Sequence, residues 1–421
     1  MRVGHAEVEA VAQRYGTPFY LFHPERFEAN LRQFADSMRA RYEPFILGYS
    51  FKTNYLPAAC LLVKRTDGWA EVVSRLEYEL ALRLGYQRRR IIFNGPLKRE
   101  EDLALALGAG SVVNLDSLTE VAFVCRWVKW NPAARPVVGL RVNVRLVGPD
   151  GRSRVQEGQQ AGRFGLAGEE LERAVKMLGG SGVEIVSLHG HTSSSDRSVE
   201  NFRAIATTLC AVRQRYALDR VRYLNVGGGF FGTAAERLLG RRVPRFDEYA
   251  AAIAGTLLQD DWVSRNRPSL VAEPGVSVVA DAMSFYTRVH STKRVAGGKR
   301  FVTVDGSVLN VKPTMHPHNM PFRHIRARGG EEGEVLSYDV VGSTCMEKDV
   351  ILREVELHEP RPGDYLEIGG CGAYTTVMTP PFINPAPAIL APDGDGGFEL
   401  LRTEQSLEQF LAAYRMGGDA A

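Results

Sequence analysis

Short apolar runs and amphipathic segments alternate regularly between residues 24 and 275. Apolar runs of this length are typical of buried strands, and the segments between them repeat their apolar residues at the helical spacing of about 3.6. The predicted strands are 45–51, 69–73, 91–94, 111–115, 137–143, 183–190, 222–226 and 269–273. The predicted helices are 25–41, 55–65, 76–85, 99–108, 117–130, 168–178, 198–216 and 245–260. Strands alternating with helices over about 250 residues favour a (β/α)8 TIM-like barrel over a doubly wound sheet.

The alternation stops near residue 275, where β-branched and aromatic residues with frequent turns take over. This composition predicts a C-terminal, mostly antiparallel β-domain, which the N-terminal strand 18–22 is expected to join. Its predicted strands are 276–293, 300–304, 334–341, 350–357 and 364–368, followed by a last helix at 406–415. We therefore expect two domains, a barrel at 24–275 and a β-domain made of 1–23 plus 276–421.

Composition excludes several classes of protein. The 421 residues carry 52 basic and 49 acidic side chains, a balance that indicates no nucleic-acid or membrane partner. No apolar run approaches the roughly 18 residues of a membrane span, and the N-terminus lacks the apolar core of a signal peptide. The cysteines are five in number and form no Cys-x-x-Cys pair. A reduced, cytoplasmic protein without a metal site is expected.

Lys52 stands where the first predicted strand of the barrel ends. A lysine there either reaches solvent or is a partly desolvated amine that attacks an aldehyde as a Schiff-base lysine. A barrel carries its active site at the C-terminal ends of its strands, and polar residues gather at those positions here. They are Glu71, Asn94, Asn114 to Asp116, Asn143, His189, His191, Gly227 to Gly229 and Glu273. So many polar groups around one lysine favour a bound cofactor.

The glycine triplet Gly227, Gly228 and Gly229 exposes successive backbone N–H groups, as a phosphate-binding nest does, although it is also compatible with a plain turn. A phosphate nest near an aldehyde-binding lysine suggests pyridoxal 5′-phosphate (PLP). Glu273 is then placed to keep the pyridine nitrogen protonated, with a strand-end salt bridge as the alternative. His191 is a candidate to lie flat on the ring, whereas we expect His189 to pack inside the barrel.

Two segments of the β-domain carry further candidates. Cys345 lies in the polar, Gly-rich stretch 341–349, which is a poor place to bury a free cysteine. Tyr374 lies between small residues in the stretch 370–375, where its phenol either donates to phosphate or only packs.

Taken together, these residues resemble the PLP-dependent fold type III decarboxylases, the alanine racemase-like family of diaminopimelate, ornithine and arginine decarboxylases. The likeness covers nearly the whole chain, with motifs in matching order. The family's Tyr-Ala-Val-Lys-Ala-Asn is similar to Tyr49 to Asn54, which implies that Lys52 is the PLP lysine. The family's carboxylate near that lysine corresponds to Glu71, and a second glutamate corresponds to Glu77. His191 to Ser194 resemble the family's His-Ile-Gly-Ser, which implies ring stacking by His191 and a phosphate contact by Ser194.

The resemblance also assigns roles near the end of the barrel and in the β-domain. The stretch 227–230 is similar to the Gly-Gly-Gly-Phe phosphate loop, and 273–275 to the Glu-Pro-Gly motif. The stretch 342–345 resembles Gly-Pro-Thr-Cys, which implies that Cys345 reprotonates the decarboxylated carbon. The stretch 372–374 matches Gly-Ala-Tyr, which implies a phosphate contact by Tyr374. In this family the cysteine reaches the partner subunit's site, so the resemblance implies a head-to-tail homodimer with shared active sites.

Departures from the family pattern concern the substrate. Val276 replaces an arginine, Met346 replaces an acidic residue that holds the substrate's distal ammonium, and Lys312 stands where diaminopimelate decarboxylases place an arginine. Without the acidic residue a buried distal amine would lose its ion-pair partner. The pattern is similar to the siderophore-biosynthesis branch, whose substrates are amino acids joined to citrate or a similar acid. Candidate contacts for the substrate tail are Arg163, Lys312, His316, Arg323 and Met346, and the stretch 315–320 is unusual.

Three other interpretations stay open. One is diaminopimelate decarboxylase in lysine biosynthesis, and another is a non-catalytic regulator that keeps the PLP fold. A racemase on the same barrel would place a basic residue against the pyridine nitrogen, so Glu273 argues against it.

Overall fold

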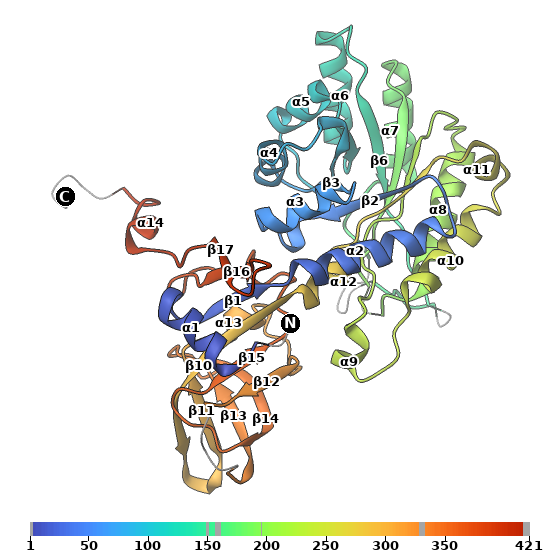
Figure 1. Ribbon diagram of the computed structural model, residues 1–421. Helices are drawn as coiled ribbons and strands as arrows, with labels where there is room; N and C mark the ends of the chain where they lie inside the picture. The colour runs from blue at the N-terminus through green and yellow to red at the C-terminus, as the bar shows by residue number, and fades with distance from the viewer. Residues whose placement is uncertain (1–2, 149–150, 156–160, 195, 328–332, 416–421) are drawn as a thin grey trace. The chain divides into compact units, whose positions relative to one another are not determined.

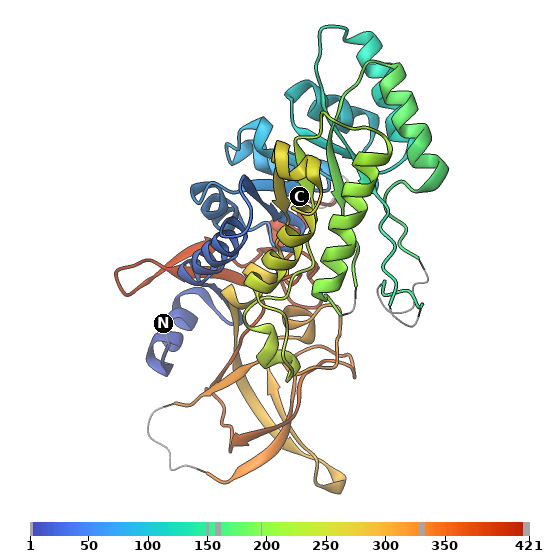
Figure 2. The same ribbon diagram turned by 90° about the vertical axis from the view of Figure 1, so that its right-hand side faces the viewer.

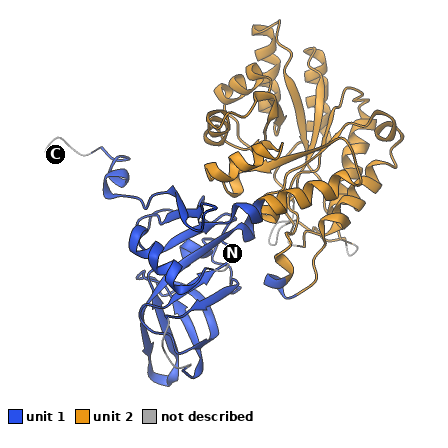
Figure 3. Ribbon diagram, viewed as in Figure 1, with its two compact units in different colours: residues 1–27, 237–240, 279–421 blue, residues 28–236, 241–278 orange. Residues whose placement is uncertain are grey.

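The computed structural model describes residues 3–148, 151–155, 161–194, 196–327 and 333–415 (Figure 1). The chain forms two compact units, coloured separately in Figure 3. Unit 1 comprises Met1–Phe27, Arg237–Gly240 and Val279–Ala421, and unit 2 comprises Glu28–Glu236 and Arg241–Val278. The predicted domain limits, 24–275 and 1–23 plus 276–421, stay a prediction.

Unit 2 contains a closed barrel of parallel strands, which confirms the predicted fold class. In chain order the strands are β2 (Phe45–Ser50), β3 (Trp69–Val72), β4 (Ile91–Phe93), β5 (Val112–Leu115), β6 (Val137–Val142), β7 (Ile185–Gly190), β8 (Tyr223–Asn225) and β9 (Ser269–Ala272). Each pairs with the next, and β2 closes the barrel against β9 with Leu47 opposite Ala272. The strands are almost entirely buried because helices cover their outer face.

Helices precede, connect and follow the barrel strands, and the long ones pack around the barrel (Figure 1). They are α2 (Pro24–Arg39), α3 (Pro57–Arg65), α4 (Arg75–Arg83), α5 (Glu100–Ala109), α6 (Leu118–Trp130), α7 (Gly168–Gly180), α8 (Val199–Arg215), α9 (Ala235–Leu239), α10 (Phe246–Leu257), α11 (Asp261–Asn266) and the short α12 (Val276–Val279). Helices α8 and α10 lie side by side, and Phe202, Phe230 and Tyr249 join them to the loop after β8. The Phe202 and Phe230 rings stack at 4.2 Å, so this aromatic cluster fixes the residue that ends the glycine loop.

Unit 1 is built on a mostly antiparallel sheet, as predicted. Its strands are β1 (Phe19–Phe22), β10 (Met283–Arg294), β11 (Arg300–Val304), β12 (Phe322–Ile325), β13 (Val335–Val341), β14 (Val350–His358), β15 (Tyr365–Ile368), β16 (Ala388–Pro392) and β17 (Phe398–Arg402). The main order is β14-β13-β11-β10-β1-β16-β17, and β15 pairs with both β10 and β12. The hairpin of β10 and β11 projects at the foot of Figure 2. The N-terminal strand β1 lies inside this sheet, between β10 and β16.

The N-terminal and C-terminal segments of the chain share one hydrophobic core in unit 1. Helix α1 (His5–Tyr15) packs its apolar face, including Val8 and Val11, against the sheet. Phe19 of β1 stacks on Tyr286 of β10 with 5.0 Å between ring centroids. Segments from both ends of the sequence therefore contribute apolar groups to one core.

The sequence pattern missed some details of unit 1. The predicted strand 276–293 begins as a helical turn, α12 and the 3-10 helix Ala280–Ala282, before β10 starts at Met283. Strands β12, β16 and β17 and the short helix α13 (Val308–Val311) were not predicted. The last helix, α14 (Leu407–Leu411), is shorter than the predicted 406–415. Within the described residues no helix is long and apolar enough to cross a membrane.

Candidate active site

Lys52 lies at the C-terminal end of the barrel, in the 3-10 turn Phe51–Thr53 that follows β2. Its Nζ donates to Glu71 Oε2 at 2.7 Å and to Ser50 Oγ at 2.6 Å. The Glu71 carboxylate is buried, whereas the Lys52 side chain keeps 35% of its exposure. A buried carboxylate therefore orients an amine that a small molecule can still reach.

Glu273 directly follows β9 and is buried on the same end of the barrel. Its Oε1 accepts hydrogen bonds from Asn94 Nδ2 at 2.7 Å and from Asn225 Nδ2 at 2.6 Å. Burial alone would raise the pKa of Glu273, but the neighbouring His189 and Lys52 charges and the Asn225 amide lower it well below the ordinary value. The carboxylate stays ionised, as a partner for a protonated ring nitrogen must.

His189 lies in β7 and His191 directly follows it, and the two histidines have different surroundings. His189 is buried inside the barrel, as expected, with Nε2 at 3.5 Å from Glu273 Oε2. His191 accepts a hydrogen bond at Nδ1 from the Gly228 backbone N–H at 3.1 Å. Desolvation, followed by the charges of Arg141 and Lys52, lowers the pKa of His191 to about 3. A neutral imidazole with a fixed ring plane suits stacking, although stacking on a cofactor stays a prediction.

Glu77 and Glu120 share one local motif. Ser74 and Ser117 are helix N-caps that accept from the Glu77 and Glu120 backbone N–H groups. The two glutamates reach back, Glu77 to the Val73 N–H and Glu120 to the Asp116 N–H, each at 2.8 Å. The serine cap and the hydrogen bond from the residue before it bury both carboxylates for a structural reason. Burial raises the pKa of Glu77 to about 7, and the nearby Glu71 adds to this rise.

The raised pKa of Glu77 makes a stability prediction. In the unfolded chain this carboxyl titrates near its ordinary 4.5, so between that pH and about 7 the unfolded state binds fewer protons than the folded state. The free energy of unfolding should therefore fall as the pH rises through this window, by up to about 3 kcal/mol from this group. Glu77→Gln keeps an acceptor for Val73 and removes the titration. Urea unfolding at pH 5 and pH 8 should show a smaller fall for this variant than for the wild type.

Glu184→Gln is the matched control for that prediction, because Glu184 is exposed on the barrel surface. Equal falls for the wild type and both variants would contradict the assignment to Glu77.

The glycine loop after β8 has a backbone conformation that residues with a side chain would not readily adopt. Gly227 and Gly229 have φ values of 68° and 100°. A Cβ at Gly228 would lie 2.4 Å from the Glu273 carbonyl oxygen, whereas one at Gly229 would meet nothing within 4 Å. The loop thus packs against the end of β9 on one side and is open at Gly229. On the neighbouring segment, Ser194 Oγ accepts from Asn201 Nδ2 at 2.8 Å.

The remaining predicted site residue of unit 2 is Arg163. Its guanidinium lies 4.1 Å from the centre of the Phe164 ring and is exposed. A residue that sequence reasoning missed lies beside it: Arg141 also contacts the Phe164 ring, at 4.6 Å, and donates to Asp116 Oδ1 at 3.1 Å and to the His191 carbonyl at 3.2 Å. A charged residue inside the apolar run 137–143 was the signal that could have revealed it.

Cys345 belongs to unit 1 and is exposed in the turn between β13 and β14, which agrees with its expected place outside a packed run. Asp349 holds this turn: its Oδ2 accepts from the Thr344 N–H at 3.0 Å and from Thr344 Oγ1 at 2.6 Å. A Cβ at Gly342 would lie 2.3 Å from the same carboxylate, so glycine is required there. Met346 follows Cys345 and is half-buried. The turn presents a thiol from a fixed backbone.

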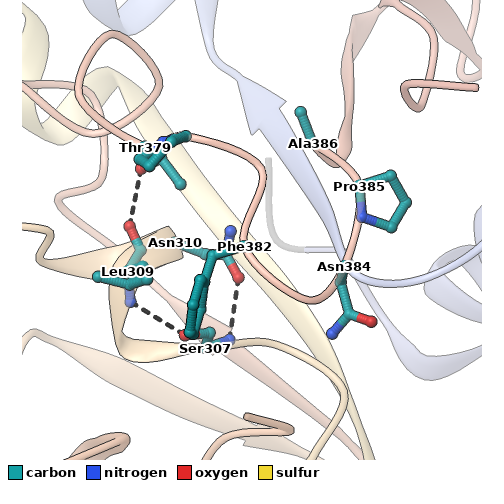
Figure 4. Close-up of a pocket in the computed structure, with 9 residues that line it drawn as sticks. Ser307, Leu309, Asn310, Thr379, Phe382, Asn384, Pro385 and Ala386 are labelled. Carbon is teal, nitrogen blue, oxygen red and sulfur yellow. Dashed lines mark hydrogen bonds between the residues drawn. The ribbon is translucent and has the colours of Figure 1, made fainter. Parts of the chain in front are cut away.

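Tyr374 and a small pocket both lie in unit 1. Tyr374 has a φ of 57°, an unusual backbone region for a large side chain. The pocket is lined by Ser307, Leu309, Asn310, Thr379, Pro380, Phe382, Asn384, Pro385 and Ala386 (Figure 4). Its hydroxyls are engaged, because Ser307 Oγ accepts from the Leu309 N–H and Thr379 Oγ1 donates to the Leu309 carbonyl. None of these lining residues is charged, so the pocket itself carries no acid–base chemistry.

Lys312 is a buried cation of unit 1, with an exposure of 3%. Its Nζ donates to the His318 carbonyl at 3.1 Å, and among the described residues no carboxylate forms an ion pair with it. Burial, followed by the charge of Arg353, lowers the pKa of Lys312. His316 lies close enough for Lys312 to lower its pKa too, after burial, and its Nδ1 is buried without a hydrogen-bond partner in the described part of the chain. Such a cluster would be stabilised by an anion.

Arg323 lies in β12 and is engaged within unit 1. Its guanidinium pairs with Glu367 at 2.6 Å and donates to the Val3 carbonyl at 2.7 Å. These contacts give it a structural role in the sheet, and its predicted contact with a substrate stays a prediction. Among the described residues no group of His, Cys, Asp and Glu side chains has the arrangement of a metal site.

The residues of unit 2 fit PLP. Lys52 offers an amine to the aldehyde, and Glu273 offers an ionised carboxylate to the ring nitrogen. In the loop at 227–229 the Gly227 N–H donates to Asn225 Oδ1 and the Gly228 N–H donates to His191 Nδ1, whereas the loop is open at Gly229, which leaves room for a phosphate there. His189 Nε2 lies 3.5 Å from Glu273 Oε2, whereas the buried His189 Nδ1 has no hydrogen-bond partner among the described atoms, so the protein alone does not satisfy every polar group of the site.

Comparison with known proteins gives a consistent result. The family of the pyridoxal-dependent decarboxylase, pyridoxal binding domain, matches residues 25–280. A diaminopimelate decarboxylase of Methanothermobacter thermautotrophicus is 28% identical over 97% of this chain and 94% of its own length. The probable chloroplastic diaminopimelate decarboxylase of Oryza sativa is 27% identical over 96% of this chain and 80% of its own length.

Solved structures share the fold. The diaminopimelate decarboxylase of Methanocaldococcus jannaschii superposes with a TM-score of 0.86 at 24% identity, covering 97% of this chain and 94% of that one. The Helicobacter pylori enzyme, solved with L-lysine, gives a TM-score of 0.81 at 24% identity over 96% of this chain and 98% of that one. Because the family match spans more than half of the chain, including Lys52 and Glu273, this protein belongs to the PLP-dependent fold type III decarboxylases and is a lyase.

Proposed function

We propose that this protein is a diaminopimelate decarboxylase. The observation that carries the proposal is the similarity, along nearly the whole chain, to curated diaminopimelate decarboxylases from a plant and an archaeon. The geometry of Lys52, Glu71 and Glu273 supports a decarboxylase with its chemistry intact and speaks against the non-catalytic regulator.

The reaction breaks the bond between the α-carbon and its carboxylate, releases CO2 and puts a proton on the same carbon. Bound PLP supplies the electron sink that accepts the electron pair left behind. Lys52 holds the cofactor, and Glu273 keeps a proton on the ring nitrogen. The thiol of Cys345 gives its proton to the α-carbon.

The distal end of diaminopimelate carries a carboxylate and an ammonium group. We assign the carboxylate to the buried Lys312 and to His316, which lack an acidic partner in the described part of unit 1. Met346 offers the ammonium group no ion pair. Arg163 and Arg323 are weaker candidates, because one is exposed and the other pairs with Glu367.

Met346 favours one second candidate, an amino acid already joined to citrate or a similar acid, as in siderophore biosynthesis. A tail of this kind has carboxylates but no distal ammonium, so it needs no acidic partner. The same Lys312 and His316 would meet it.

Release of CO2 from a panel of amino acids separates the two candidates. Purified protein loaded with PLP should convert meso-diaminopimelate to lysine and CO2. The rate of CO2 release from meso-diaminopimelate should exceed the rates from lysine, ornithine and arginine. A citryl-linked diamino acid that reacts much faster than diaminopimelate would replace the first candidate with the second. No CO2 from any of these compounds would overturn both.

The role of Cys345 makes a kinetic prediction. Cys345→Ala should lower kcat by about 10²- to 10⁴-fold, the usual contribution of a positioned general acid, with little change in PLP binding. Steady-state kinetics and the visible absorption of bound PLP measure the two effects. Cys125→Ala is the matched control. Cys125 lies on α6, and its Sγ donates to the Met177 carbonyl on α7, so among the described residues it contacts a neighbouring helix and no residue of the candidate site. A kcat within threefold of wild type would rule out Cys345 as the proton donor.

The family resemblance also supports a head-to-tail homodimer with shared sites and a cytoplasmic location. Mixing Lys52→Ala and Cys345→Ala proteins tests the dimer. Shared sites would restore part of the activity, because a mixed dimer contains one site with both residues intact.

A further inference from the structure

Asn94 joins the two carboxylates of the candidate active site. It follows β4, and its Nδ2 donates to Glu71 Oε1 at 3.0 Å and to Glu273 Oε1 at 2.7 Å. All three side chains are at most 4% exposed. The remaining oxygens face different partners: Glu71 Oε2 holds Lys52 at 2.7 Å, and Glu273 Oε2 lies 3.5 Å from His189. The Asn94 amide nitrogen therefore connects Glu71, which holds Lys52, to Glu273, the proposed partner of the cofactor's ring nitrogen.

The orientation of the Asn94 amide follows from its partners. Ionised carboxylates only accept hydrogen bonds, so the NH2 group must face Glu71 and Glu273. The Asn94 Oδ1 accepts from Asn114 Nδ2 at 2.8 Å, which fixes the other side. Asn114 in turn needs the space left by Gly139 on β6, where a Cβ would lie 2.0 Å from the Asn114 Oδ1. Residues of β5 and β6 thus hold the Asn94 amide, which follows β4, in place.

The position of this amide has an electrostatic consequence. Two buried carboxylates that accept from the same amide nitrogen repel each other, because like charges raise the cost of ionisation. A hydrogen-bond donor that serves both charges offsets their repulsion. Without the Asn94 amide, each carboxylate would lose one hydrogen-bond donor.

We propose that Asn94 is a positioning residue that keeps Glu71 and Glu273 ionised together and thereby sets the protonation state of the bound cofactor. The inference rests on the cofactor roles proposed for Lys52 and Glu273, and it is independent of the substrate. The other titratable or charged groups that act on these carboxylates and on their partners are Lys52, Glu77, Arg141, His189 and His191.

A pH titration of the visible absorption of the PLP-loaded protein tests this inference. The spectral change of interest is the one that accompanies protonation of the Glu71 and Glu273 pair at low pH. For Asn94→Ala we expect its midpoint to rise by about one pH unit, because the pair takes up a proton more readily without the amide donor. Asn94→Asp should shift it further, since it adds a third carboxylate at nearly the same volume. Glu71→Gln introduced into the Asn94→Ala protein should move the midpoint back toward the wild type.

Asn225→Ala is the matched control, because Asn225 donates to the same oxygen of Glu273 and does not contact Glu71. Its shift should not be reversed by Glu71→Gln. If only the Asn94→Ala shift is reversed, the effect comes from coupling between the two carboxylates. If both shifts are reversed, it comes from the loss of a hydrogen bond to Glu273 alone.

Unchanged midpoints in both Asn94 variants would overturn the inference and leave Asn94 a packing residue. An equal effect of Glu71→Gln in the wild-type and Asn94→Ala proteins would overturn it as well. Asn94→Asp keeps the test valid if the alanine variant does not fold. A wild-type protein without a visible band would refute the cofactor site and this inference together, whereas a wrong substrate would not alter the titration.

Discussion

Replacing Lys52 by alanine should lower kcat/KM for decarboxylation by at least about 10³-fold. The variant loses the amine that binds the aldehyde of PLP, and Glu71 is left as a buried carboxylate without its cation. Steady-state assays of CO2 release measure the loss, and the visible absorption of the purified protein shows whether the covalent link to PLP has gone.

Lys176→Ala is the control for this prediction, because Lys176 is an exposed lysine on α7 that pairs only weakly with Glu172. It should keep wild-type activity. A Lys52→Ala protein that retained its visible band and an activity within tenfold of wild type would show that another amine carries the cofactor.

The second large effect is expected from Glu273→Gln, which should lower kcat by about 10²-fold or more with a smaller change in KM. Glutamine keeps the size of the side chain and acceptor capacity for Asn94 and Asn225, but it carries no negative charge. A protonated ring nitrogen then has no counter-charge, and the electron sink weakens. Because the pKa of Glu273 is lowered in the folded protein, the wild type should keep this function down to acidic pH.

Glu184→Gln makes the same chemical change on the barrel surface and should leave kcat unaltered. If the Glu273→Gln protein decarboxylated at a rate within threefold of the wild type, the carboxylate would not act on the cofactor ring.

The sequence was sufficient to predict the barrel, because each strand of a parallel sheet is buried on both faces and leaves an uninterrupted apolar run. Lys52 was identifiable for the same reason, since a cation at the end of such a run needs an explanation. The serine N-caps of α4 and α6 were also encoded locally, because in each case a serine follows a strand and precedes an amphipathic segment.

The bridge at Asn94 could not be predicted in the same way. Asn94 stood out as a strand-end residue, but its contacts join β3, β4 and β9, which lie far apart in the sequence. Which strand-end side chains meet depends on barrel register, and register is not visible in one sequence. Arg141 was missed because its partners, Asp116 and the His191 carbonyl, come from two other strand ends.

The missed strands of unit 1 have a different cause. Phe322–Ile325 carries Arg323 and His324, and its pairing with β15 is supported by tertiary contacts and not by an alternating pattern. The strand Ala388–Pro392 follows a proline-rich stretch that predicts a loop. For such segments the surrounding sheet decides the conformation, and local propensity does not.

Mapping the site of covalent PLP attachment tests the central claim most directly. Borohydride reduction of the PLP-loaded protein, followed by digestion and mass spectrometry, should place a pyridoxyl group on the peptide that contains Lys52. Attachment at Lys98 or Lys312, or at no lysine, would contradict the account of a PLP-dependent decarboxylase centred on Lys52.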